Sequence, residues 1–408
     1  MHDRMNYLKT QDFPIHFMAY WWLFWIVISY THFNEFAAPS FASLAQYLLL
    51  LIAFLLGHIA MKNFLPKDVP SNNVGVRGLQ IQSIRVRRVI RLASFGSLLM
   101  LLAGLYLAGA FSVEFNEYYT NVRILGGLDG ADVTGIHVLD VLTKILAFPL
   151  AYSILVTVLA VDLVSMRMFF FASIASFICF SYLWQLNYPL IHMFWIVVFY
   201  TLVTAQRQGR FNRKIIALAA IICGGLILSS VNRFNGAILD SIQHYMINYH
   251  LIGFTFYDLQ YTDPNSILHT HSFGLSSLGF LEQVFENLLK LFSIGYQAAS
   301  SENADFLNKP IDIGGGEAKM FNAFGTMIFT LYRDLNFVGI LLGGFIYGGF
   351  ITYVRYRSHI SWRHGALFLL LASAWMMGMM VSPLEQAYFW FVIVMLGLIQ
   401  LVNRGVKR

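Results

Sequence analysis

Three arginines stand where they could bind phosphate groups. Arg233, Arg123 and Arg333 each lie beside a long apolar stretch, in parts of the chain that contain few other basic residues. A guanidinium in such a place can form charge-assisted, bidentate hydrogen bonds to a diphosphate. It can equally anchor the chain on lipid phosphate. For Arg233 the position leaves both roles open, whereas for Arg123 it favours the anchor.

Candidate proton acceptors lie in two short segments. His269 and His271 form a His-x-His pair, which could supply a base near neutral pH, contact a sugar or bind a metal. Two histidines do not make a zinc site, and no cluster of cysteines or carboxylates completes one, so we expect no metal. Tyr332, Arg333 and Asp334 stand at the start of an apolar segment. This Arg and carboxylate could bind phosphate and accept a proton, or they could be a capping pair.

Other residues that suggest chemistry have simpler interpretations. Gly314, Gly315 and Gly316 lack the following Lys-Ser or Lys-Thr of a phosphate loop, so they predict a turn or hinge. Cys179 and Cys223 are the only cysteines and lie inside apolar runs, which gives no disulfide framework. We therefore expect no cofactor.

The composition indicates what kind of elements must position these side chains. The chain is 58% hydrophobic and 12% charged, whereas soluble domains carry about 25% charged residues. Long apolar runs recur from end to end, and a helix of roughly 20 such residues crosses a membrane, so we predict an all-α polytopic membrane protein with about ten spans. The predicted spans lie near residues 15–31, 43–61, 90–111, 137–161, 168–186, 189–205, 215–231, 336–354, 364–381 and 386–403.

The distribution of charge predicts the orientation of these spans. With ten spans both termini face the same side, and 20 of the 27 Lys and Arg residues fall in the tails and connections of that side. Because basic residues favour the cytoplasm, we place both termini there, in a bacterial inner membrane. This signal accounts for the net charge of +6, so we predict no binding to nucleic acid.

The predicted spans divide the chain into three consecutive segments. They are a bundle of seven helices at 1–231, with a basic cytoplasmic loop at 62–89 and a periplasmic loop at 112–136; a large periplasmic loop at 232–321, between the seventh and eighth helices; and a loop-to-span motif with the last three helices at 322–408. Long loops of this kind are usually functional.

The large loop contains two amphipathic stretches, Gly236–Ile252 and Phe280–Gln297, which we interpret as interfacial helices. In the second, Glu286 and Lys290 have the i,i+4 spacing of a surface pair. Between the two stretches, Asp258–His271 is polar and aromatic. That composition suits contact with sugars, since hydroxyls need hydrogen-bond partners and sugar rings stack on aromatic faces, but it also suits an ordinary loop.

Two segments, together about a quarter of the chain, resemble the O-antigen polymerase family, whose members polymerise oligosaccharide repeat units. The first runs from Arg233 through Tyr249 and Gly253, and is similar to the family's order of Arg, Tyr and Gly. The second contains Asn322-Ala-Phe-Gly-Thr326, Tyr332-Arg-Asp334, Gly339 and Phe345-Ile-Tyr-Gly348. Leu335 and Asn336 stand where the family usually has Phe-Gly, a departure that affects the local turn.

The resemblance implies a glycosyltransferase that needs no nucleotide. The donor would be a glycan on undecaprenyl diphosphate, the acceptor a sugar hydroxyl of a second lipid-linked unit, and a chain-length regulator the partner. The following roles are implied. Arg233, helped by Arg123 or Arg333, would hold the diphosphate; Asp334, His269 or His271 would be the catalytic base; and Tyr249, Asn322 and Tyr332 would bind substrate.

Two alternatives stay open. An O-antigen ligase has a similar span count and a large outer loop, but transfers the finished chain to lipid A core. A flippase or other transporter would need a polar, charge-lined cavity. Only Asp140 and Lys144 lie well within a predicted span, and their spacing favours a self-neutralising pair, which argues against transport.

Overall fold

The computed structural model describes residues 2–31, 35–66, 84–127, 132–161, 166–208, 213–231, 239, 243–292, 294–307, 309, 311–313, 320–321 and 325–404. Within them, six helices are long and apolar enough to cross a membrane, so the chain is an all-α membrane protein. They are Phe41–Phe64, Arg87–Leu107, His137–Val161, Arg167–Trp184, Tyr188–Gln206 and Met327–Arg357; the shorter apolar helices are Asp12–Ile28, Ile216–Gly225 and Ala387–Ile399.

Every predicted span overlaps a helix of the described chain. The number of crossings and the side on which the termini lie stay predictions. The chain forms two compact units, and each unit is assembled from stretches that are far apart in the sequence. Unit 1 contains residues 1–67, 237–353 and 374–387, and unit 2 contains residues 68–236, 354–373 and 388–408.

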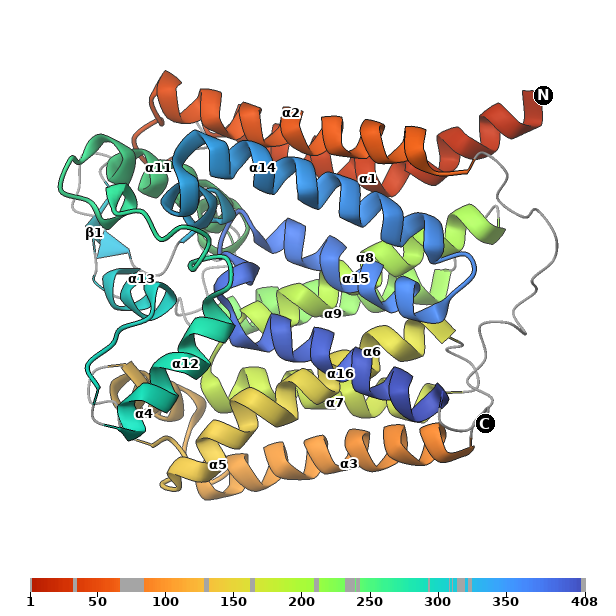
Figure 1. Ribbon diagram of the computed structural model, residues 1–408. Coiled ribbons are helices and arrows are strands. Elements are labelled where there is room, and N and C mark those ends of the chain that lie inside the picture. Colours follow the sequence, from red (N-terminus) through yellow and green to blue (C-terminus); the bar gives the residue numbers. More distant parts are fainter. Residues whose placement is uncertain are drawn as a thin grey trace. The chain divides into compact units, whose positions relative to one another are not determined.

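Unit 1 combines long helices with short elements at one end (Figure 1). The long helices α1, α2 and α14 run alongside one another, and the short elements α11, α12, α13 and β1 gather at the end where α14 begins. The elements are α1 (His2–Ile28), α2 (Phe41–Phe64), η4 (Gln243–Asn248), α11 (Tyr249–Thr262), η5 (Ile267–His269), α12 (Gly279–Leu291), α13 (Ala299–Leu307), antiparallel β1 (Ile311–Asp312) and β2 (Met320–Phe321), α14 (Met327–Arg357) and η6 (Pro383–Glu385).

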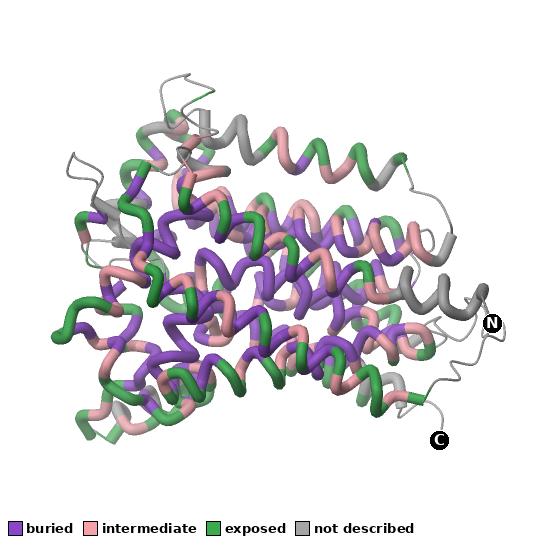
Figure 2. The backbone as a smooth tube through the Cα atoms, turned by 90° about the horizontal axis from the view of Figure 1, so that it is seen from above, coloured by how far each residue is buried: buried purple, intermediate pink, exposed green. Residues whose placement is uncertain are grey.

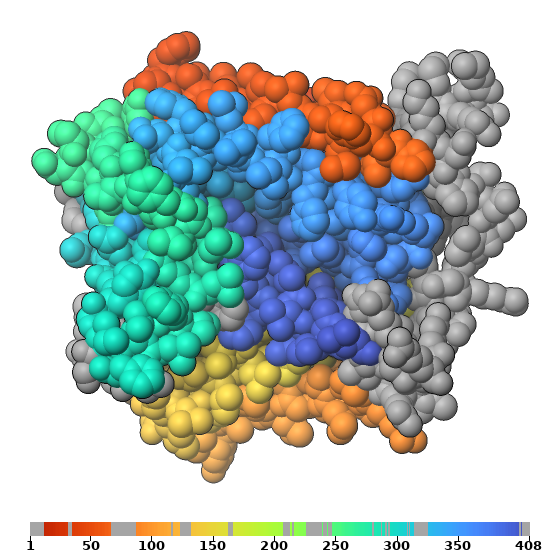
Figure 3. Space-filling model, viewed as in Figure 1, coloured from red at the N-terminus to blue at the C-terminus, as the bar shows by residue number. Residues whose placement is uncertain are grey.

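Helices α2 and α14 pack closely because each helix has a glycine that faces the backbone of the other helix. A Cβ atom at Gly348 would lie 1.9 Å from the carbonyl oxygen of Phe54, and one at Gly57 would lie 2.0 Å from that of Phe345. Figure 3 shows the two helices side by side at the surface. Small residues at such positions let membrane helices approach closely, so this contact fixes where the start of α14 lies in unit 1.

Helix α14 is interrupted where the sequence departs from the family pattern. Leu335 has φ −148° and ψ 32°, and Asn336 has φ 54° and ψ −141°. The second conformation is one that glycine adopts far more readily than residues with a Cβ atom. A Cβ at Gly339 would lie 2.0 Å from the carbonyl oxygen of Leu331. The residues before the break therefore form a short helix of their own, which carries Tyr332, Arg333 and Asp334.

The stretch Asp258–His271, for which the sequence left sugar contact and an ordinary loop both open, begins within α11 and also contains the short helix η5. Helix α11 continues to Thr262, is buried along most of its length and packs on α1 and α2. A Cβ at Gly253 would lie 2.3 Å from the carbonyl oxygen of Met379. In the described part of the interfacial helix predicted at Gly236–Ile252, residues 250–252 are buried in α11 rather than exposed at a surface.

Unit 2 is built around α3, α6, α7, α8 and α9, with α3 and α6 packed on α7 and α8 packed on α9. Several of the long helices in Figure 2 carry both buried and exposed residues, whereas α6 is buried along nearly all of its length. The elements are α3 (Ile84–Leu107), α4 (Phe115–Gly127), α5 (His137–Leu142), η2 (Thr143–Ala147), α6 (Phe148–Val161), α7 (Arg167–Trp184), α8 (Tyr188–Gln208), α9 (Arg213–Val231), α15 (Trp362–Met377) and α16 (Ala387–Arg404). Residues 374–377 of α15 and Ala387 belong to unit 1, and residues 354–357 of α14 belong to unit 2.

Asp140 and Lys144 have different neighbours in this unit. The Asp140 carboxylate accepts hydrogen bonds from the backbone N–H groups of Val133 (2.7 Å) and Thr134 (3.2 Å). The Lys144 ammonium lies 3.7 Å from the ring centre of Trp184, a cation–π contact. Both groups thus serve local packing, and the self-neutralising pair that their spacing predicted is not formed by direct contact.

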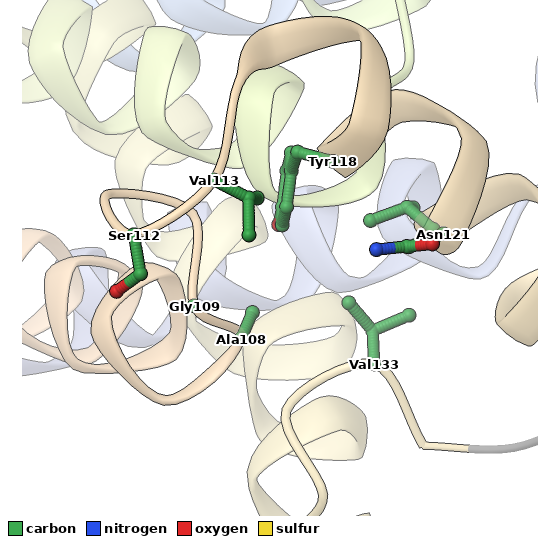
Figure 4. A pocket seen from close by; sticks show the side chains of 8 residues that line it. Ala108, Gly109, Ser112, Val113, Tyr118, Asn121 and Val133 are labelled. Atoms are coloured by element: carbon green, nitrogen blue, oxygen red, sulfur yellow. The ribbon is translucent and has the colours of Figure 1, made fainter.

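A small cavity of about 270 Å³ opens in unit 2 where α3 ends and α4 begins. Figure 4 shows the side chains of Val113, Tyr118 and Val133 around it. The Tyr118 hydroxyl donates a hydrogen bond of 2.9 Å to the carbonyl oxygen of Leu183. The cavity is lined mainly by apolar atoms and contains no charged side chain among its described residues, so we do not assign the chemistry to it.

Candidate functional site

Asp334 holds the turn that precedes α12. One oxygen of its buried carboxylate accepts hydrogen bonds from Ser272 Oγ (2.6 Å) and the Ser276 N–H (2.9 Å), and the other accepts from the N–H (3.1 Å) and hydroxyl of Ser277. An ionised carboxylate offers about four acceptor positions, and this turn occupies them. The predicted role of Asp334 as a base is therefore less favourable than a structural one.

Arg333 is equally engaged with the protein. Its side chain is 3% exposed. The guanidinium donates to the carbonyl oxygen of Ala299 (2.8 Å), to Asn303 Oδ1 and to the carbonyl oxygen of Thr270 (3.4 Å), and it pairs with Glu302. Four N–H groups are directed at protein acceptors, so Arg333 is a positioning residue that fixes α13 and the segment at Thr270, rather than a cation exposed to a diphosphate.

Asn303 joins this arginine to a second buried carboxyl. The Asn303 side chain is completely buried. Its Oδ1 accepts from Arg333, while its Nδ2 donates to Glu385 Oε1 (2.5 Å) and lies 3.4 Å from Ser276 Oγ. The Thr330 hydroxyl also donates to Glu385 Oε1, at 2.9 Å. A continuous polar network therefore connects α13, α14, η6 and the turn before α12.

The environment of Glu385 favours the protonated acid. Burial raises the pKa of Glu385 to about 7, and the nearby Asp334 charge acts in the same direction. The hydrogen bonds from Thr330 and Asn303 and the positive charge of Arg333 lower it, but burial is the larger effect. A carboxyl whose pKa is near neutral can exchange its proton under ordinary conditions, and such groups gather at functional sites.

An aromatic cluster lies beside this network. The ring of Tyr332 is 5.7 Å from Tyr261, 6.2 Å from His269 and 5.6 Å from Phe337, measured between ring centres. Tyr257 packs beneath, with ring centres 6.2 Å from both Tyr261 and Tyr332. Tyr261 and His269 are half-buried and Phe337 is exposed, so the cluster presents an aromatic surface that includes an imidazole.

His271 lies at the edge of the same region but faces outward. It is exposed, and its Nε2 lies 3.1 Å from Asn336 Nδ2, at the break in α14. When the Asn336 amide donates this hydrogen bond, Nε2 is the acceptor and the proton of the neutral ring is on Nδ1. Of the two histidines, His269 is the one that the aromatic cluster positions.

Asp258 connects α11 to the start of α2. Its carboxylate accepts from the hydroxyls of Ser43 (2.6 Å) and Ser40, the N-cap residue of α2. The Tyr257 hydroxyl donates to Gln46 Oε1. These bonds fix the helix on which Tyr257 and Tyr261 stand, and so they position the aromatic cluster.

The structure brings together Tyr332, Arg333, Asp334, His269 and His271, which the sequence had treated as two separate segments. The link is direct, because the Ser272 N–H donates to the carbonyl oxygen of Arg333 and the Phe273 N–H to that of Asp334, both at 3.0 Å.

The remaining predicted site residues either lie on other described elements or fall outside the described residues. Tyr249 is the half-buried first residue of α11, and Arg123 lies on α4 in unit 2. Arg233, Asn322 and Gly314–Gly316 lie outside the described residues. No group of three or more His, Cys, Asp or Glu residues within the described chain could hold a metal ion.

Sequence analysis missed Glu385 and Asn303. The signal for Glu385 was a single carboxylate in a short polar connection, Ser382-Pro-Leu-Glu-Gln386, between two long apolar segments. Asn303 gave no signal, because it lies in an ordinary polar stretch.

Comparison with known proteins gives no match: no family model fits the chain, and no curated protein or solved structure is significantly similar to it.

Proposed function

We propose that this protein polymerises oligosaccharide repeat units linked to undecaprenyl diphosphate, at the periplasmic face of a bacterial inner membrane. The observation that carries the proposal is the partly exposed cluster of Tyr261, His269, Tyr332 and Phe337 at the start of a membrane helix. Sugar rings pack on aromatic faces, and the imidazole offers a base beside them. The predicted charge asymmetry puts this end of α14 outside the cytoplasm.

The reaction requires one proton transfer and one departing anion. A hydroxyl oxygen of the acceptor unit attacks the anomeric carbon of the donor, the bond from that carbon to the diphosphate oxygen breaks, and undecaprenyl diphosphate leaves with the electron pair. The base takes the hydroxyl proton, and a cation stabilises the charge that develops on the diphosphate. The bond to diphosphate is already activated, so no nucleotide is consumed.

The described contacts refine the roles that the sequence suggested. We assign the base to His269, since Asp334 is occupied by the turn before α12 and His271 is at the edge of the cluster. Arg233 and Arg123 stay the candidate diphosphate-binding cations. Arg333 acts indirectly, by holding α13 and the segment at Thr270 in place.

Substitution of Tyr261 tests the sugar-binding role of the cluster. In a deletion strain that carries the variant gene, Tyr261→Ala should shorten the polymer and lower its yield, because an aromatic face is lost without removing a buried charge. The matched control is Tyr106→Ala, which removes an exposed tyrosine on α3 and should leave the length distribution unchanged. A normal ladder of chain lengths with Tyr261→Ala would contradict the proposal.

His269→Gln and Arg233→Ala test the base and the cation. Each should lower the rate of polymer formation in membrane preparations supplied with lipid-linked repeat units, while the amount of protein in the membrane stays the same. Unchanged yield and chain length with Arg233→Ala would remove the assignment of that residue.

The phenotype of a deletion strain separates the proposal from its alternatives. Loss of a polymerase leaves the lipid A core capped with one repeat unit. Loss of an O-antigen ligase leaves uncapped core, with polymer retained on the carrier lipid. Loss of a flippase leaves repeat units on the inner leaflet.

A further inference from the structure

Helix α12 is amphipathic with its polar side directed into the protein. Glu282 and Glu286 are buried, whereas Leu281, Phe285 and Leu288 on the opposite side are each at least half exposed. The prediction that Glu286 belongs to a surface pair with Lys290 is therefore wrong for Glu286. A helix on a water-soluble surface has the reverse arrangement, with its apolar stripe toward the core.

The two buried carboxylates have defined partners at the start of α13 and in the segment just before it. Glu282 accepts hydrogen bonds from the Ala299 N–H (2.8 Å) and the Tyr296 hydroxyl (2.6 Å), and the carboxylate raises the pKa of that tyrosine to about 12. Glu286 accepts from the Ala298 N–H (3.0 Å) and Ser301 Oγ (2.6 Å). Carboxylates at a helix N-terminus accept hydrogen bonds from its free N–H groups and interact favourably with the positive end of the helix dipole. This pairing fixes which side of α12 faces the protein.

The exposed side is larger than one helix stripe. Phe273, Leu275 and Leu278 in the turn before α12 are exposed, and Phe292 and Ile294 after it are also exposed. Soluble monomers rarely expose contiguous apolar patches of more than a few hundred Å². Figure 3 shows α12 at the surface of the molecule.

The turn before α12 lies beside the break in α14, and the exposed residues of α14 beyond that break are apolar. The Phe273 N–H donates to the carbonyl oxygen of Asp334 at 3.0 Å, which places the exposed turn directly beside the break in α14. Beyond the break, Phe337, Val338 and Ile346 are exposed on a helix that is long and apolar enough to cross a membrane. The acyl chains that would surround α14 in a bilayer can therefore also reach the exposed side chains of the turn before α12 and of α12 itself.

We propose that α12 and the turn at 272–278 lie in the headgroup region of the leaflet where α14 begins, with Leu281, Phe285 and Leu288 in contact with acyl chains. Interfacial helices bury their apolar side to a depth of about 5–10 Å. The membrane then holds α12, α12 holds the N-terminus of α13 through Glu282 and Glu286, and α13 presents Asn303 to Arg333. The proposed contact between α12 and the membrane is argued from the fold alone, and it does not depend on which reaction the site performs.

Spin labels at single cysteines test this contact in lipid nanodiscs that contain one protein molecule each. Cys179 and Cys223 are first replaced by Ala, and one label is then placed at Leu281→Cys, Phe285→Cys or Phe292→Cys. Ile346→Cys on α14 is the lipid-facing control, and Asp263→Cys, an exposed polar position of the same unit, is the aqueous control. Relaxation is measured with oxygen, which concentrates in lipid, and with a water-soluble nickel chelate.

Labels at Leu281 and Phe285 should collide with oxygen more often than with the nickel chelate, as at Ile346, and Asp263 should show the reverse. The Phe292 label gives an independent reading outside the helix. A label at Phe285 that behaves like the one at Asp263 would overturn the proposal, because the face would then be in water. A label shielded from both reagents would also overturn it, because protein would then cover the face. Neither result bears on the polymerase assignment, which the deletion strain tests separately.

Discussion

Two buried polar networks of this protein differ in the kind of groups that form their hydrogen bonds. In unit 2 the network is neutral: His192 Nε2 lies 2.7 Å from the Tyr388 hydroxyl, and Nδ1 lies 3.1 Å from the Tyr152 hydroxyl, which is 2.6 Å from Ser373 Oγ. In unit 1 the network is charged, because Arg333 is linked through Asn303 to Glu385 and directly to Glu302.

The surroundings of the two networks also differ. Tyr152, His192 and Ser373 are fully buried among the helices α6, α8 and α15. The network of Arg333 lies beside the half-buried Tyr261 and His269 at the start of α14. Enclosed hydroxyls and an imidazole are a means of fixing helices against one another. Buried charges are weak evidence for stability, and in some proteins they are retained for another purpose, so we place the proposed chemistry in unit 1.

The largest effect is expected from Arg333→Met. Removing the guanidinium leaves Asn303 Oδ1 and the carbonyl oxygen of Ala299 without their donor, and breaking a buried charged pair lowers the free energy of unfolding by about 3–5 kcal/mol. The half-exposed Glu302 can be rehydrated, so we expect the lower end of that range. Thermal unfolding in detergent measures the stability, and the polymer ladder measures function.

Arg355→Met is the matched control for this prediction. Arg355 is also buried, in unit 2, and donates to Gln206 Oε1 (2.7 Å) and Ser358 Oγ (3.0 Å). We expect a loss of stability with a normal ladder at a temperature where the variant is folded. If the two variants impaired the ladder equally at matched folded fractions, the assignment of chemistry to unit 1 would fail.

The second prediction concerns the pH dependence of stability caused by Glu385. Its pKa is about 7 in the folded protein, against 4.5 for an ordinary glutamate. Between these values the folded protein keeps a proton that the unfolded chain has lost, so stability falls as pH rises from about 4.5 to about 7. At about 1.4 kcal/mol for each pH unit the total is of the order of 3 kcal/mol.

Glu385→Gln should remove this slope. The variant should have a higher unfolding temperature than the wild type at pH 8 and a similar one at pH 5. The chain also contains 12 histidines, so the readout is the difference between the two proteins at each pH. Parallel curves over pH 5 to 8 would show that Glu385 does not keep its proton in the folded state.

A smaller effect is expected from His192→Phe in the neutral network. The substitution removes the hydrogen-bond partner of the Tyr388 hydroxyl, while Tyr152 keeps Ser373. One buried hydroxyl without a partner lowers stability by about 1–3 kcal/mol. The polymer ladder should be unchanged once the protein is folded. Loss of polymer from a stably folded variant would give unit 2 a part in the chemistry.

The positions of the helices were predictable because apolar runs of membrane length have few alternatives. The contacts of the polar residues were not. Arg333 was correctly placed at the start of a long helix, but most of its acceptors come from α13, a nine-residue helix in a polar stretch. The surface position of Glu286 was predicted wrongly, since spacing alone does not reveal that its buried carboxylate accepts a hydrogen bond from the Ala298 N–H, just before α13.

Asn336→Gly should give the smallest effect and sharpens the view that α14 is built around a break. Asn336 has φ 54° and ψ −141°, a strained backbone conformation that costs of the order of 1–3 kcal/mol for a residue with a Cβ atom. Glycine relieves that strain but gains freedom in the unfolded chain and loses the contact with His271, so we expect a net stabilisation of about 1 kcal/mol or less. Asn336→Val should destabilise instead.

Gln185, with φ 51° and ψ 40° at the end of α7, is the control in unit 2, because its left-handed conformation is an ordinary helix end. Unfolding temperatures of the glycine and valine variants at both positions give the comparison, and a more stable Asn336→Val would show that α14 has no such break.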